Sequence, residues 1–152
     1  IGVSVAEADT YIKNYLDTFS GVRQYMEDTV SFAQQNGYIE TMFGRRRALP
    51  EISSSNKNIV NFGKRVAMNT PIQGTAADII KIAMIRVYRR LQKEHLESRL
   101  ILQVHDELIV ETPEQEVQQV RRLLQEEMQG AVSLKVLLKA DVNDGKTWFD
   151  AK

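Results

Sequence analysis

Three side chains that could perform acid–base or metal chemistry stand together at His105, Asp106 and Glu107, between two apolar stretches. Stretches of β-forming residues are usually joined through glycine, asparagine or a polar loop, and no glycine eases this connection. In extended chain the two acids would point to opposite sides and could not both bind one ion squarely, so a two-metal site would need another carboxylate from a different strand. Aspartate also favours turns for local reasons. The motif alone therefore leaves a metal site and a simple turn both open.

A second candidate is a polar stripe in which Arg65, Asn69 and Gln73 are spaced by four residues. On a helix this spacing places all three side chains on one face. Amide side chains both donate and accept, which suits the minor-groove acceptors of every base pair, and the arginine would meet a phosphate. Alternatively, Gln73 only completes a capping box and Asn69 only ends a helix. Gly74 disfavours helix by about 1 kcal/mol relative to alanine, which indicates that another segment packs closely there.

A third candidate is the run Arg45, Arg46 and Arg47, whose guanidinium groups suit phosphate binding through charge and bidentate hydrogen bonds. The run lies in a basic region, because residues 38–95 carry eleven basic and four acidic side chains while the whole chain has a net charge of zero. Clustered positive charge suits a polyanion. An ordinary solvated turn is the alternative interpretation.

The composition excludes several other classes of function. The chain has no cysteine, which excludes a disulfide scaffold, a thiol nucleophile and a zinc site built on thiolates, and its two histidines are His95 and His105. No apolar run approaches the roughly 20 residues of a membrane span, and no targeting peptide opens the chain. We therefore expect a soluble cytoplasmic protein without a membrane partner. Because Ile1 stands where an initiator methionine would, we also expect a fragment of something longer.

The elements that must position these side chains follow from the spacing of apolar residues. Predicted helices cover residues 5–18, 22–36, 59–69, 71–93 and 113–129, and predicted strands cover residues 38–43, 47–49, 99–104, 108–111 and 135–142. A hairpin is expected around Gly44, and a polar loop at residues 53–57. This order of elements indicates an α+β fold in which an antiparallel sheet packs on long helices.

Capping residues set several of these helix boundaries. Ser4 begins a capping box that opens the first helix, and Gly21 is expected to separate this helix from the second, which Gly37 ends. Thr70 precedes Pro71 and is biased out of helical geometry, which predicts a break between two helices. Thr70 and Gln73 would then form the capping box of the second of these helices.

In order and spacing, four segments resemble the bacterial DNA polymerase I family, the family A polymerases. Residues 69–81 (NTPIQGTAADIIK) resemble that family's palm helix, and residues 102–108 (LQVHDEL) resemble its C-terminal catalytic motif. Residues 43–52 and 148–152 also match, so the resemblance covers essentially the whole chain. Leu137 stands where the family usually has proline.

The resemblance implies roles for individual residues in DNA synthesis. Asp106 would be a ligand of the catalytic metal pair, usually Mg²⁺, with Glu107 supporting the site near the primer end and His105 contacting the primer terminus. The amides of Asn69 and Gln73 would touch the minor groove of the newly paired duplex. Backbone contacts would come from four arginines: Arg65, Arg45, Arg46 and Arg47.

The resemblance also implies a division of the chain and a set of partners. Residues 1–37 would be the end of the fingers subdomain, and residues 38–152 the C-terminal part of the palm. The partners would be primer–template DNA, deoxynucleoside triphosphates and the remainder of the polymerase, in the cytoplasm at the nucleoid. The family's first metal carboxylate and its nucleotide-binding helix have no counterpart here, so the chain is expected to be inactive alone. A non-catalytic duplex-binding module is the alternative.

Overall fold

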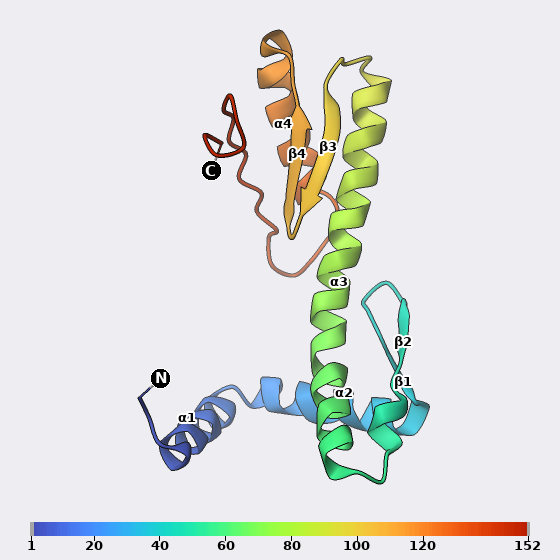
Figure 1. Ribbon diagram of the computed structural model, residues 1–152, viewed down its shortest axis with the longest axis vertical. Coiled ribbons are helices and arrows are strands. Elements are labelled where there is room, and N and C mark those ends of the chain that lie inside the picture. Colours follow the sequence, from blue (N-terminus) through green and yellow to red (C-terminus); the bar gives the residue numbers. More distant parts are fainter. Residues whose placement is uncertain (1, 152) are drawn as a thin grey trace. The chain divides into compact units, whose positions relative to one another are not determined.

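The computed structural model describes residues 2–151, which form two compact units, one up to Thr75 and one from Ala76 onward (Figure 1). The boundary falls inside one long helix, α3 (Lys57–Lys93). The predicted α+β class is confirmed. The predicted single sheet is wrong, because the strands form two separate two-stranded antiparallel sheets.

The first unit opens with two helices, α1 (Val5–Thr18) and α2 (Ser20–Asn36). The predicted capping box is present at Ser4, whose hydroxyl accepts a hydrogen bond from the Glu7 N–H while the Glu7 carboxylate accepts one from the Ser4 N–H. The predicted break at Gly21 is wrong. Phe19 leaves helical geometry instead (φ −107°, ψ 63°), and Gly21 lies inside α2, where a single glycine is tolerated at modest cost.

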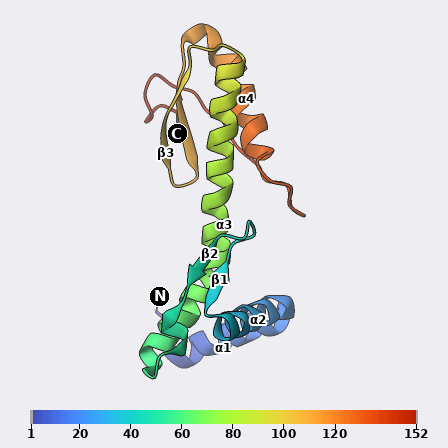
Figure 2. The same ribbon diagram turned by 90° about the vertical axis from the view of Figure 1, so that its right-hand side faces the viewer.

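A short hairpin follows, in which β1 (Tyr38–Glu40) pairs with β2 (Arg46–Ala48). Gly37 ends α2 in the left-handed conformation at φ 74°, as expected for a C-terminal glycine. The strand β1 is shorter than predicted because residues 41–45 form a hydrogen-bonded turn, and β2 has the predicted length but begins one residue earlier. The hairpin runs beside the first part of α3 (Figure 2).

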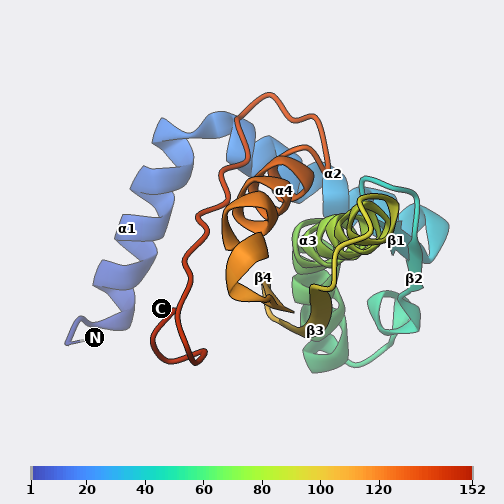
Figure 3. The same cartoon turned by 90° about the horizontal axis from the view of Figure 1, so that it is seen from above.

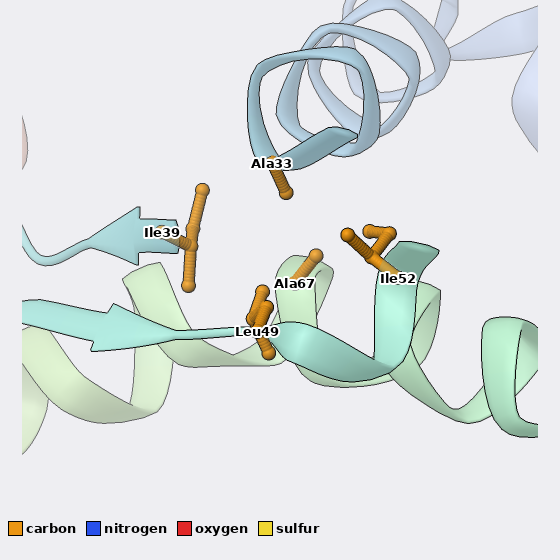
Figure 4. Close-up of a cluster of buried hydrophobic side chains, with 5 residues drawn as sticks. All are labelled: Ala33, Ile39, Leu49, Ile52 and Ala67. Carbon is orange, nitrogen blue, oxygen red and sulfur yellow. The ribbon is translucent and has the colours of Figure 1, made fainter. Parts of the chain in front are cut away.

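The core of the first unit gathers side chains from four elements (Figure 4). One of these elements is a short 3₁₀ helix, η1 (Pro50–Ser53), whose last residue is the first of the predicted polar loop. The core residues are buried to 5% exposure or less, and they are Ala33, Ile39, Leu49, Ile52 and Ala67. Burying this apolar surface fixes α2 and the hairpin against the first turns of α3.

The helix α3 continues through Pro71, so the predicted break at Thr70 is wrong. Proline lacks the N–H that would have bonded the carbonyl of Ala67, and its ring crowds that carbonyl. Packing on both sides compensates for this loss, because Ala67 is fully buried in the core and Thr75 accepts a hydrogen bond from the hairpin. The predicted capping box is also absent, since the Thr70 hydroxyl donates to the Val66 carbonyl at 2.7 Å.

The second unit packs a hairpin and a helix against the rest of α3. The strand β3 (Arg99–Val104) pairs with β4 (Glu107–Glu111), with an irregularity between Leu100 and Leu102, and α4 (Val117–Gln129) follows the short 3₁₀ helix η2 (Glu114–Glu116). Two leucines and one valine of the hairpin pack against buried side chains of α3 and α4. The buried side chains are Val87, Leu91, Val120, Leu123 and Leu124.

Charged side chains reinforce the packing of α3 against α4. The Arg90 guanidinium contacts the carboxylates of Glu94 at 2.7 Å, Glu126 at 2.5 Å and Glu127 at 3.1 Å. Hydrogen bonds to these carboxylates, that to Glu94 foremost, raise the pKa of Arg90 above its ordinary value. The β3–β4 hairpin therefore packs on two helices, α3 and α4, that contact each other through both apolar and ionic side chains.

The predicted strand at residues 135–142 is wrong. The chain after α4 runs without a helix or strand over this stretch (Figure 3). Side chains bind its carbonyl oxygens where a neighbouring strand would otherwise do so: Gln129 donates to Ala140 at 3.4 Å and Arg121 donates to Val142 at 3.3 Å. Among the described residues 2–151, no helix is long and apolar enough to cross a membrane.

A carboxylate fixes the start of the hairpin that carries the acids. Oxygen Oε2 of Glu116 accepts hydrogen bonds from the Ser98 N–H at 3.0 Å and the Ser98 hydroxyl at 2.5 Å, and Oε1 accepts one from the Glu97 N–H at 3.0 Å. Ser98 is only 3% exposed. These bonds, that of the Ser98 hydroxyl foremost, lower the pKa of Glu116 below its ordinary value of 4.5.

We predict that Glu116→Gln lowers the melting temperature at pH 7, because an amide replaces a carboxylate that accepts three hydrogen bonds. A lowered pKa in the folded state gives stability that is present above the ordinary value and is lost as the pH falls through the folded one. The difference between variant and parent should therefore shrink as the pH falls below 4.5. Thermal unfolding against pH measures this, with Glu114→Gln on the same turn as control; equal effects of both substitutions would contradict it.

Candidate functional site

The predicted chemical motif occupies the turn between β3 and β4. Val104 pairs with Glu107, so His105 and Asp106 alone form the turn and Glu107 begins the second strand. All three motif side chains are exposed. His105 has a φ of 52°, in the left-handed region that favours glycine. Holding a non-glycine residue there costs free energy, and such strain is concentrated at functional sites.

Gln103 braces this strained turn. Its Nε2 donates a hydrogen bond to the His105 carbonyl oxygen at 2.6 Å. Gln103 lies within the predicted motif, but its residue type predicts no part in the site. No residue type in the sequence marks Gln103 for this contact, because its acceptor is defined only by the folded turn.

The two acids line a cleft of about 1040 Å³ in the second unit. Its lining includes Asp106, Glu107, the first turns of α3 after Thr75 and the segment that follows α4. Carboxylate oxygens are hard ligands, and Mg²⁺ is typically bound by one or two carboxylates together with substrate phosphates. The donor set therefore fits Mg²⁺. Within residues 2–151, no group of three or more histidine, aspartate and glutamate side chains converges as a metal site.

The polar stripe lies on the part of α3 that belongs to the first unit. Arg65, Asn69 and Gln73 are all exposed, and because the helix is continuous through Pro71 their spacing places them on one face. Both alternative interpretations are now excluded: Asn69 ends no helix, and Gln73 completes no capping box. The Arg65 guanidinium lies 6.0 Å from the centroid of the Phe62 ring.

The three consecutive arginines do not form one row. Arg45 turns towards α3 and donates to the Gly74 carbonyl at 3.1 Å. Arg46 contacts the Glu40 carboxylate at 3.3 Å and lies 4.4 Å from the centroid of the Tyr38 ring. Arg47 is exposed and pairs with Ile39 across the hairpin.

Gly74 packs closely against another segment, as its sequence context predicts. A Cβ atom at Gly74 would lie 2.7 Å from Cγ2 of Thr41, a separation that real side chains do not tolerate. Thr41 is 5% exposed, and nothing in its residue type marks it as part of a site. The sequence around Gly74 therefore predicts a close contact but not that Thr41 makes it.

Comparison with known proteins assigns the chain to a family. The family model for DNA polymerase family A matches residues 1–150. This chain belongs to DNA polymerase family A. The resemblance inferred from the sequence is thus confirmed.

The family A relatives are longer than this chain. It is 52% identical over all 152 residues to the DNA polymerase I of Bacillus caldotenax and 50% identical to that of Bacillus subtilis (strain 168), and it spans 17% of the length of each. A solved structure, described as the POL domain of Pol1 from M. smegmatis in complex with DNA primer-template and dNTP, matches with a TM-score of 0.94 and 45% identity. That match covers 98% of this chain and 26% of the other. The division into fingers and palm at residue 37 stays a prediction.

We predict that the free energy of unfolding of His105→Gly exceeds that of His105→Ala by about 1 kcal/mol, because only glycine adopts the left-handed conformation without a steric penalty. Urea unfolding of the two variants measures this difference. Both variants keep the hydrogen bond from Gln103, because its acceptor is the backbone carbonyl oxygen of residue 105. The same pair of substitutions at Lys81, exposed within α3, is the control and should give the opposite order, with glycine less stable by about 1 kcal/mol. Alanine equal to or better than glycine at position 105 would show that the turn is unstrained.

Proposed function

We propose that this chain takes part in template-directed DNA synthesis, in which a primer 3′-hydroxyl attacks the α-phosphate of a deoxynucleoside triphosphate and releases pyrophosphate. The observation that carries the proposal is the exposed Asp106 on a braced, strained turn, in a chain that belongs to DNA polymerase family A. On this proposal the chain acts on DNA in the cytoplasm, at the nucleoid.

Asp106 is the proposed ligand of a divalent ion, usually Mg²⁺, and Glu107 supports the same site. When bound, the metal pair lowers the pKa of the primer hydroxyl and stabilises the oxygens of the leaving group. His105 lies beside Asp106 on the turn and contacts the primer terminus. Gln103 keeps the turn in the conformation that presents these side chains to the cleft.

This site is shared with another part of the polymerase. A two-metal site needs a further carboxylate, and the described residues offer Asp106 with Glu107 alone at the turn. The nucleotide-binding side chains that the family resemblance implies likewise lie elsewhere. The chain spans 17% of the relatives it matches, which supports the proposal that a complementary part of a polymerase supplies these groups.

The stripe on α3 is the proposed contact with the minor groove. Asn69 and Gln73 can pair with the acceptors that both A·T and G·C pairs present there, so they would sense duplex geometry without reading sequence. Arg65 and the arginines at 45–47 would bind phosphates of the duplex backbone. The exposure of all these residues supports this role.

We predict that a chimera, in which this chain replaces the matching region of the Bacillus subtilis relative, extends a primer, whereas the chain alone does not. Asp106→Ala in the chimera should reduce the extension rate more than about 100-fold, because even residues that only support a metal ligand cost 10–100-fold. The matched control is Glu114→Gln, an exposed acid in η2 that does not line the cleft, which should leave extension nearly unchanged.

The second candidate function is a non-catalytic duplex-binding module, which the exposed stripe favours. The same chimera distinguishes this function from catalysis. Salt-sensitive duplex binding that falls with Arg65→Ala, in a chimera that never extends a primer, would support the module. Robust extension by the purified chain alone, abolished by Asp106→Ala, would instead contradict the shared site.

A further inference from the structure

The turn of the first hairpin, residues 41–45, is organised around the buried Thr41. The Thr41 hydroxyl accepts hydrogen bonds from the Phe43 N–H at 3.3 Å and the Arg45 N–H at 3.2 Å. The backbone closes the same turn, because the Thr41 N–H donates to the Arg45 carbonyl at 3.0 Å. The conformation of Arg45 is therefore set by Thr41.

Three contacts dock this turn onto α3 beside Gln73. The Met42 N–H donates to the Thr75 hydroxyl at 2.9 Å, and Nη2 of Arg45 donates to the Gly74 carbonyl at 3.1 Å. The Thr41 methyl group occupies the space that a side chain at Gly74 would fill, 2.7 Å from the position of its Cβ. Glycine alone permits so close an approach.

We propose that Thr41 is a positioning residue for the duplex-binding face. By seating its methyl group on Gly74, it holds the Arg45 guanidinium next to the turn of α3 that carries Gln73, so that phosphate and minor-groove contacts are made together. Thr41 is buried and does not itself reach DNA. The inference deepens the duplex binding assigned under the proposed function and rests on it.

A purely structural role for this contact predicts a different response to salt. Protein–DNA affinity falls with salt concentration in proportion to the number of phosphates that the protein neutralises. A glycine-to-alanine substitution removes no charge, so it changes the slope of this dependence only if it displaces a charged side chain from the duplex. The slope therefore tests positioning separately from stability.

The experiment measures binding of the full chain to a fluorescent DNA duplex by anisotropy over a series of salt concentrations. Gly74→Ala should weaken binding about tenfold and reduce the slope by about one, as Arg45→Ala does, because either change removes one phosphate contact. Combining the two should add little. Thr41→Ser/Gly74→Ala should restore affinity and slope, since serine keeps the hydroxyl and lacks the clashing methyl group. Gly21→Ala, in helix with nothing within 4 Å of the new Cβ, is the matched control.

Amide hydrogen exchange without DNA supplies an independent readout. The Met42 and Arg45 amides should exchange faster in Gly74→Ala and return to the parent rate in the double variant, because their acceptors are the Thr75 and Thr41 hydroxyls. An unchanged salt slope in Gly74→Ala, or a failure of Thr41→Ser to rescue it, would overturn the positioning role. If the parent chain binds no duplex, both this role and the proposed duplex face are overturned. A return of the amide exchange rates to the parent values in the double variant would then identify the contact as structural only.

Discussion

The continuity of α3 through Pro71 is the constraint on which the rest of this structure depends. One helix supplies Ala67 to the core of the first unit and Val87 and Leu91 to the core of the second. Continuity also turns a sequence spacing of four into a single exposed face for the polar stripe. A broken helix would have separated Gln73 from Asn69 and left both with ordinary capping roles.

Both regions to which a function is proposed combine a locally unfavourable residue with a specific contact that holds it. At the β3–β4 turn, His105 adopts a left-handed conformation, and Gln103 holds its carbonyl oxygen. At the turn of the first hairpin, the Thr41 methyl group packs against Gly74 in the middle of α3, where any larger residue would clash with it. In each case further contacts hold the side chains to which a role is proposed, a pattern that is common where function and stability compete.

Much of this could be predicted from the sequence, because the relevant interactions are local. The capping box at Ser4, the glycine that ends α2 and the two short apolar strands around residue 105 depend on neighbours within a few residues. Tertiary contacts decide the two places where the prediction is wrong: the hairpin and the core pack on α3 around Pro71, where the helix is continuous, and side chains of α4 bind carbonyl oxygens of the stretch at 135–142. Gln103 and Thr41 were missed as braces because their partners are defined only by the folded turns.

The most direct test of the account is anomalous diffraction from the chimera, crystallised with Mn²⁺, a nucleotide and a primer–template whose primer lacks its 3′-hydroxyl. The account predicts a manganese peak about 2.1 Å from a carboxylate oxygen of Asp106, the distance typical of Mg²⁺ sites, with a further ligand from outside residues 1–152. Manganese bound at the nucleotide without any ligand from Asp106 would contradict the central claim that this turn supplies the metal site.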